Sequence, residues 1–141
     1  MNKLNVELNA VSSEIDKMLT EFLHTSFDVR QKAIQAGAEV FKSAVESATP
    51  IGETGKMAQS WKIKTEYPDH RYVGNTKTAK GKVYRKTKNG KRGEAREGVP
   101  LSNVLEYKEN SPHYGFIRKC FDENEAKIYQ AIKSKIKNGG N

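Results

Sequence analysis

The segment from residue 71 to residue 98 most restricts how this chain can fold, because it holds the protein's whole charge imbalance. It contains ten Lys or Arg residues and only two acidic residues, Glu94 and Glu97. The full chain has 25 Lys and Arg against 17 Asp and Glu, so the other residues carry 15 of each. Positive charge concentrated in one stretch favours an arm that meets an anion or a partner over a body that is basic throughout. A solvated, flexible loop is the alternative interpretation of the same composition.

Helical periodicity dominates the chain before this segment. Apolar residues recur at spacings of three and four between Val11 and Leu23, and again between Ala33 and Ala48. Polar residues interrupt the pattern at 24–26, and Thr49 with Pro50 ends it. The sequence therefore predicts either one broken helix or two consecutive helices.

Alternating apolar and polar residues mark the candidate strands. Residues 61–67 form the clearest alternation, and Pro68 stops it. Residues 71–75 and 81–87 are candidates for a second and a third strand, with Asn89-Gly90 supplying the positive-φ residues of a tight hairpin turn. A shorter alternation at 4–8 predicts a strand or a frayed lead-in. The basic arm is expected to be either an extended hairpin or a loop that becomes ordered on assembly.

The last third of the chain returns to helical patterns. Residues 100–107 fit a short helix or a strand, of which we favour a helical turn, and apolar residues recur at helical spacing from Ile117 to Ile136. We predict an α+β fold with N-terminal helices and a C-terminal helix packed on a small antiparallel sheet. Its length favours a single domain, 1–141, that includes 71–98 as a basic loop or hairpin arm.

The residues of catalytic and metal sites are not found at useful spacings. Cys120 is the only cysteine, so an intramolecular disulfide is excluded and a cysteine-based zinc site lacks ligands. Gly55-Lys56 falls short of a phosphate-binding loop, because Pro50 stands where the first glycine is required and Met57 where Ser or Thr is required. No apolar run reaches the roughly 20 residues of a membrane span. We therefore expect no enzyme, no cofactor, no metal and no membrane partner.

Three short motifs occur in a fixed order along the chain. The first is a helix closing on Thr49-Pro50 and followed by residues 54–61, the second is Val104-Leu105-Glu106-Tyr107, and the third is residues 111–117 before the last helix. This arrangement resembles the minor tail-completion, or head-to-tail joining, family of long-tailed phages and prophages. The resemblance implies a compact α+β fold without catalysis, whose copies form a ring at the neck or at the head-proximal end of the tail.

The resemblance also implies partners and a location. The partners would be copies of the chain in a ring, with six as one expected number, neighbouring neck, connector or tail-tube proteins, and the genomic DNA passing through. The protein would lie in the virion, and in the host cytoplasm during assembly. We expect the turn after the first helices to depend on Pro50, Thr54 and Gly55, where glycine's backbone freedom suits a sharp change of direction.

Two sets of residues are candidates for contacts with partners. Glu106, Tyr107 and Phe116 form a predicted subunit contact, in which Glu106 either pairs with a cation of a neighbour's arm or is an ordinary surface carboxylate. The predicted partner- or DNA-facing surface of the arm consists of Lys80, Lys82, Arg85, Lys86, Lys88, Lys91 and Arg92.

A small basic nucleic-acid-binding protein is the alternative function. In that case the arm would grip phosphates while Tyr72 and Tyr84 stack on bases. The two tyrosines would equally serve cross-strand packing in a hairpin. A nuclease that uses the basic patch is the least favoured function, because no carboxylate cluster for a metal can be located.

Overall fold

A computed structural model describes residues 3–52 and 55–141, except for the side chains of residues 3–11, 85 and 86. The described elements follow one another as α1 (Lys3–Leu23), α2 (Phe27–Ala48), the 3-10 helix η1 (Ala58–Ser60), β1 (Trp61–Lys64), β2 (Tyr72–Asn75), β3 (Val83–Lys86), β4 (Arg92–Arg96), α3 (Leu101–Tyr107) and α4 (Phe116–Lys137). The predicted α+β class is confirmed.

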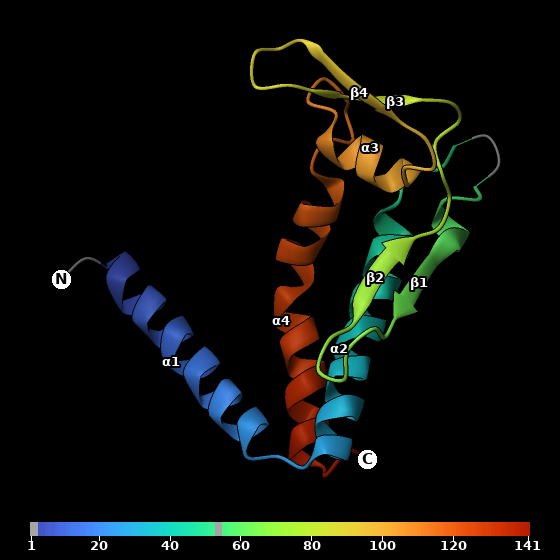
Figure 1. Cartoon of the computed structure of the whole chain (residues 1–141). Helices are drawn as coiled ribbons and strands as arrows, with labels where there is room; N and C mark the ends of the chain where they lie inside the picture. Colours follow the sequence, from blue (N-terminus) through green and yellow to red (C-terminus); the bar gives the residue numbers. More distant parts are fainter. Residues whose placement is uncertain (1–2, 53–54) are drawn as a thin grey trace.

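Two long helices, α2 and α4, form the centre of the molecule. They run side by side in opposite directions (Figure 1), and they share the most extensive interface between any two described elements. Gly37 of α2 allows this close approach, because a Cβ atom placed there would lie 2.8 Å from Cγ1 of Ile132 on α4. The buried side of the pair continues through Ile128, which is 7% exposed.

The hairpin of β1 and β2 packs on α2 and completes the core. Trp61 pairs with Asn75 and Lys64 with Tyr72 in an antiparallel register. Trp61 is buried together with Val45 of α2 and with two residues of α4, Phe116 and Cys120. The core therefore lies where the end of α2, the start of β1 and the start of α4 meet.

A buried hydrogen bond joins the end of α2 to the first strand. The indole Nε1 of Trp61 donates to the hydroxyl of Thr49 at 2.7 Å, and that hydroxyl donates to the carbonyl of Val45. Since a buried indole N–H needs a partner, Thr49 satisfies a group that the apolar core would leave unpaired.

Helix α1 stands apart from this body. The predicted interruption at 24–26 separates it from α2, so the prediction of two consecutive helices is the one confirmed. From this connector α1 diverges from α4 towards its own N-terminal end (Figure 1). Residues 4–8 belong to this helix, so the predicted strand there is wrong. Leu4 and Leu8 are also four residues apart, and the helical pattern that follows continues through them.

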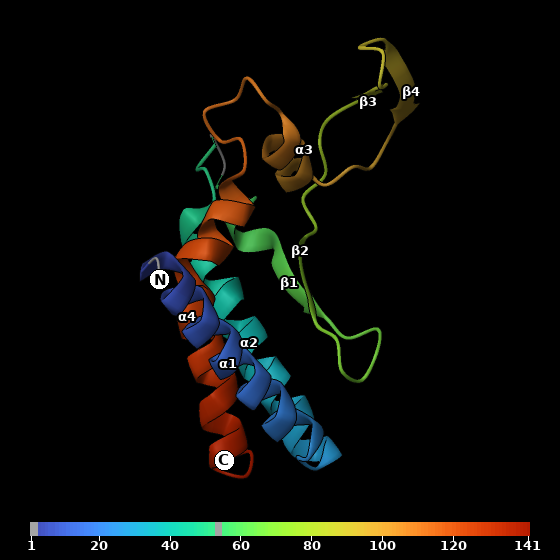
Figure 2. The ribbon, with the colours of Figure 1, turned by 90° about the vertical axis from the view of Figure 1, so that its left-hand side faces the viewer.

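The second hairpin, β3 with β4, makes a separate two-stranded sheet. It lies beyond α3 and clear of the helices in both orientations (Figures 1 and 2). Gly90 has a φ of +71°, whereas no residue other than glycine has a positive φ in the described chain. The prediction that Asn89 also adopts positive φ is therefore wrong, and the loop resembles a three-residue turn that ends in a left-handed glycine.

Candidate functional site

The base of the basic arm is fixed by backbone hydrogen bonds. The amide of Ala79 donates to the carbonyl of Val99 at 2.8 Å, and the amide of Leu101 donates to the carbonyl of Lys77 at 2.7 Å. These bonds join residues 77–79 to residues 99–101 directly before α3. Residues 72–75 of the predicted arm 71–98 are β2 and belong to the body, so only the later part of that segment projects. The arm therefore leaves the body at a defined place, although its hairpin makes no part of the core.

The hairpin itself is held by polar contacts and by one stacked pair. The amide of Gly90 donates to the carbonyl of Thr87 at 2.9 Å, and the amide of Thr87 donates to the carbonyl of Lys91 at 3.0 Å. The guanidinium carbon of Arg92 lies 3.4 Å from the ring centroid of Tyr84. Because a cation covers one face of this ring, Tyr84 is used for cross-strand packing within the hairpin.

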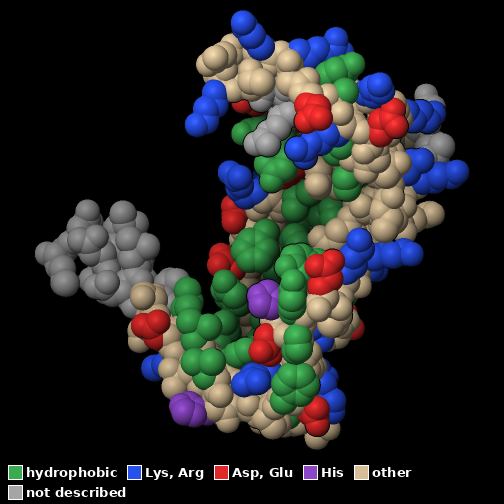
Figure 3. Space-filling view, viewed as in Figure 1, with side chains coloured by type: hydrophobic (Ala, Val, Ile, Leu, Met, Phe, Trp, Pro, Cys, Tyr) green, Lys and Arg blue, Asp and Glu red, His purple; other side chains and the backbone are tan. Residues whose placement is uncertain are grey.

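The predicted basic residues spread over the arm and its approach. Lys80, Lys82, Lys88, Lys91 and Arg92 are all exposed. Within the described part of the chain, none of the five lies at ion-pair distance from a carboxylate. Figure 3 shows Lys and Arg side chains gathered over the end of the molecule that carries the hairpin. Their charge is therefore available to a partner.

Two further predicted arm residues, Arg85 and Lys86, lie in β3. Their side chains lie outside the described part of the structure. The strand pairing places Lys86 opposite Arg92 on β4, with an irregularity in register between Tyr84 and Lys86.

The predicted turn follows the end of α2. Pro50 comes directly after Thr49, the C-cap residue, and Gly55 has a φ of +59°. The amide of Gly55 donates to the carbonyl of Gly52 at 3.2 Å. Thr54 lies outside the described residues. A left-handed φ at position 55 favours glycine, because an L side chain is strained there.

Glu106 has a structural role that the sequence did not suggest. It is 7% exposed, and its carboxylate accepts hydrogen bonds from the backbone amides of Ile117 at 2.7 Å and Arg118 at 3.2 Å. Its backbone carbonyl also accepts from the amide of Gly115 at 2.9 Å. The amides at a helix start have no partner within the helix, so Glu106 caps α4 from α3.

The other two residues of the predicted subunit contact differ in their exposure to solvent. Phe116 is 9% exposed and belongs to the core, whereas Tyr107 is 71% exposed. Since Glu106 and Phe116 are occupied within the chain, Tyr107 is the member of the set that presents most of its side chain to the surface.

The isolated cysteine is placed as a core residue. Burial raises the pKa of the Cys120 thiol above its ordinary value of 9.0, and the nearby carboxylate of Glu123 adds to the rise. A thiol that stays protonated at neutral pH is a poor nucleophile. In the described ranges, no three His, Cys, Asp or Glu residues come together as metal ligands. No described helix combines the length and apolar character needed to cross a membrane.

Comparison with known proteins gives one family. Residues 3–107, well over half of the chain, match the family model described as "Bacteriophage HK97-gp10, putative tail-component". No curated protein and no solved structure matches the chain. The matched residues include α1 through α3, the arm and Glu106, whereas α4 lies beyond them.

Membership in this family assigns the protein a general role. A phage tail component is a structural protein of the virion that contacts other tail or neck proteins. The exposed arm and the structural use of Glu106, Phe116 and Cys120 are compatible with that role. On the strength of a match that spans most of its length, the chain belongs to the HK97 gp10-like family of phage tail components.

Proposed function

We propose that copies of this chain form a ring at the neck or at the head-proximal end of the tail, where they complete the tail and join it to the head. In this role residues 1–141 act as one domain, and the basic segment 71–98 supplies its arm through the β3–β4 hairpin, while β2 remains in the body. The partners are neighbouring copies, of which six is one expected number, together with neck, connector or tail-tube proteins. The protein performs no catalysis and enters the virion after assembly in the host cytoplasm.

The position of the arm is the observation that carries this proposal. The hydrogen bonds from Ala79 to Val99 and from Leu101 to Lys77 fix its base, while its exposed cations lie clear of the body. The remainder of the chain is electrically balanced. An exposed basic hairpin on a neutral body suits electrostatic contact with acidic neighbours or with the genome, and contributes nothing to the core below it.

Tyr107 is our candidate for a contact outside the arm. It lies at the end of α3, is 71% exposed, and neighbours the buried Glu106 that fixes α4. Exposed tyrosines are enriched in protein interfaces, because they offer a large apolar area and a hydroxyl. The turn after α2, in which Pro50 and Gly55 are described, serves the fold by redirecting the chain towards β1.

The proposal is tested by removing arm charges in a phage whose only source of this protein is the variant. Replacing Lys80, Lys82, Lys88 and Lys91 by Ser should leave the free energy of unfolding within about 0.5 kcal/mol, as expected for surface changes. In phage that carries this variant, unjoined heads and tails should accumulate and be visible in electron micrographs. The matched control replaces the exposed Lys32, Lys62, Lys64 and Lys119 by Ser, which removes equal charge from the body. Normal joining by the arm variant would contradict the proposal.

Salt dependence separates this role from a phosphate-binding one. A protein that makes five phosphate contacts with duplex DNA shows a slope of about −4 to −5 in log affinity against log salt. The packing of Arg92 on Tyr84 supports a hairpin that is built for its own stability, since that ring face is covered. We expect the isolated chain to bind DNA weakly. Tight binding with the steep salt slope would instead favour the alternative function, a small basic nucleic-acid-binding protein.

A further inference from the structure

The turn of the β3–β4 hairpin contains the pair Asn89-Gly90, and both residues are exposed to solvent. An asparagine followed by glycine is chemically reactive, because glycine has no Cβ atom to keep its amide nitrogen away from the preceding side chain. That nitrogen can attack Cγ, the side-chain carbonyl carbon of the asparagine. The turn of the basic arm therefore carries both groups needed for a spontaneous change of charge.

Hydrogen bonds around the turn keep the attacking nitrogen engaged. The amide of Gly90 donates to the carbonyl of Thr87 at 2.9 Å. The amide and the hydroxyl of Thr87 both donate to the carbonyl of Lys91, at 3.0 and 3.1 Å. While these bonds exist, the Gly90 nitrogen is not free to attack. Asn89 therefore reacts in molecules whose hairpin has opened.

Opening of this hairpin costs little free energy. Strands β3 and β4 make a two-stranded sheet of their own, and in the described part of the chain each contacts extensively only the other. A two-stranded hairpin without further support is marginally stable in water. Segments with so few contacts open locally at a small fraction of the global unfolding free energy. In a chain whose arm contacts no partner, the Gly90 nitrogen is therefore released often.

A second pair of the same type, Asn138-Gly139, follows α4 and provides a comparison within the chain. Asn138 is exposed, as Asn89 is, and Gly139 has a φ of +63° where Gly90 has +71°. The amide of Gly139 donates to the carbonyl of Ile136 at 3.2 Å. The two pairs therefore share sequence, exposure and backbone conformation.

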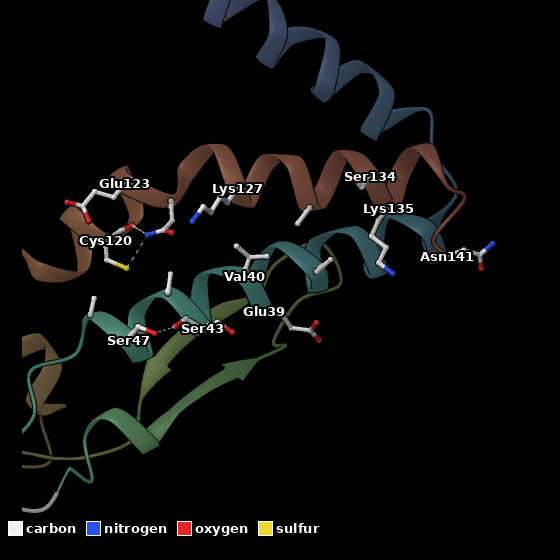
Figure 4. Close-up of a pocket in the computed structure, with 15 residues that line it drawn as sticks. Glu39, Val40, Ser43, Ser47, Cys120, Glu123, Lys127, Ser134, Lys135 and Asn141 are labelled. Carbon is white, nitrogen blue, oxygen red and sulfur yellow. Dashed lines mark hydrogen bonds between the residues drawn. The ribbon is translucent and has the colours of Figure 1, made fainter.

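The second pair differs because the body of the molecule supports it. Gly140 is buried, and a Cβ atom placed there would lie 3.0 Å from Cδ of Lys32 on α2. The amide of Gly140 also donates to the carbonyl of Lys135 at 2.7 Å. Figure 4 shows Lys135 directed from the last part of α4 towards α2, and Asn141 beside the first part of α2. Freeing the Gly139 nitrogen therefore disturbs contacts between α4 and α2, so Asn138 should react more slowly.

We propose that Asn89 is a spontaneous modification site, and that a partner which holds the arm closed suppresses its reaction. The Gly90 nitrogen forms a bond to Cγ of Asn89, and the side-chain nitrogen leaves as ammonia with the proton that the Gly90 amide gives up. A five-membered cyclic imide results. Water then adds to one of its two carbonyl carbons and breaks that carbon's bond to nitrogen, which yields aspartate or isoaspartate.

Both products weaken the arm. The new carboxylate lies close in sequence to Lys88, Lys91 and Arg92, and the ten basic and two acidic residues of segment 71–98 become ten and three. Isoaspartate also adds the β-carbon to the main chain, so Thr87 can no longer pair with Lys91 in the same register. Chains that stay unassembled thus lose the arm on which joining depends. The suppression by a partner rests on the proposed function, whereas the reaction in the free chain does not.

Incubation of the purified full-length chain at neutral pH tests the reaction. Peptide mass spectrometry follows the conversion of Asn89 and Asn138 in the same sample, and Asn89→Gln is the control that keeps an uncharged amide on a longer side chain. We expect Asn89 to convert about tenfold faster than Asn138, because its hairpin opens more easily. Equal rates, a faster Asn138, or no conversion of Asn89 would overturn the proposal.

A cross-linked hairpin tests whether opening is required. Tyr84 and Ala95 face each other across β3 and β4, so Tyr84→Cys and Ala95→Cys are combined with Cys120→Ala. In molecules that carry the disulfide, Asn89 should convert about tenfold more slowly than in the same protein after reduction, with Asn138 unchanged. The reduced protein is the matched control, since it has the same sequence. Equal conversion of Asn89 in the two forms would show that the reaction does not need an open hairpin.

Purified particles test the suppression by a partner. The rate of Asn89 relative to that of Asn138 is compared between particles and the free chain, and we expect it to be about tenfold lower in particles. An unchanged ratio in particles that contain the chain would overturn the suppression. Absence of the chain from particles would instead contradict the proposed function, while the rates in the free chain still decide the reaction itself. The two failures are therefore distinguishable.

Discussion

The carboxylate of Glu106, at the end of α3, accepts a hydrogen bond of 2.7 Å from the backbone amide of Ile117 in the first turn of α4. Through this bond the segment that follows the basic arm also determines where the C-terminal helix begins. Gly115 completes the junction, because its amide donates to the carbonyl of Glu106 and its φ is +70°. The base of the arm and the start of α4 are therefore parts of one continuous structure.

Removing this cap should destabilise the fold. Glu106→Ala leaves two partly buried amides at the start of α4 without their partner, and we expect a loss of about 2 kcal/mol in the free energy of unfolding. Glu106→Gln keeps one acceptor oxygen and should lose about half as much. Urea denaturation followed by circular dichroism measures both changes. Glu109→Ala is the control, because Glu109 is exposed. An equal loss of unfolding free energy in Glu109→Ala would show that Glu106 has no special role in capping α4.

The buried bond between Trp61 and Thr49 gives a second test. Thr49→Val keeps the side-chain shape but leaves the indole N–H of Trp61 unpaired in the core, which should cost about 1–3 kcal/mol. Thr49→Ser retains the hydroxyl, so its loss of unfolding free energy should be clearly smaller. Since Trp61 is the only tryptophan, its fluorescence follows unfolding directly. Equal stability of wild type and Thr49→Val would show that the bond contributes nothing.

The close contact between Gly37 of α2 and Ile132 of α4 gives a third test. Gly37→Val places atoms where Ile132 already packs, and overpacking of this kind costs about 1–3 kcal/mol. The double variant Gly37→Val with Ile132→Ala should recover part of that loss, because the clash is relieved. A double-mutant cycle in urea denaturation measures the coupling. Simple additivity of the two changes would contradict direct packing of position 37 against Ile132.

Alkaline pH should weaken the protein through Cys120. Its pKa is raised in the folded state, so folding favours the protonated thiol. This contribution is complete below the ordinary thiol value of 9.0 and is lost as pH rises through the folded-state pKa. Urea denaturation at a series of pH values should therefore show stability falling above pH 9.0, with a smaller fall in Cys120→Ala. Identical slopes for the two proteins would exclude Cys120 as the cause.

Local patterns were sufficient to predict most of the secondary structure. The recurrence of apolar residues gave α2 and α4, and the alternation from Trp61 gave β1, because both periods follow directly from backbone geometry. The same rule failed at residues 4–8, where a short alternation also fits a helix. The Asn89-Gly90 pair was assigned the wrong turn for a similar reason, since two types of hairpin turn share this sequence.

The tertiary role of Glu106 could not be predicted from its own surroundings. It lies eleven residues before Ile117, and only the packing of α3 on α4 brings the carboxylate to those amides. Which helix packs on which side is decided by contacts between distant segments, and a sequence pattern reports only its own element.

A quantitative protein census of purified particles tests the central claim most directly. Copies of this chain per particle are counted by mass spectrometry against the major tail-tube protein. A ring component at the neck or at the end of the tail should be present in a small and fixed number, equal to one ring in each particle. Absence from particles, with the chain recovered among the free proteins of the host cytoplasm, would contradict the claim and favour the nucleic-acid-binding function.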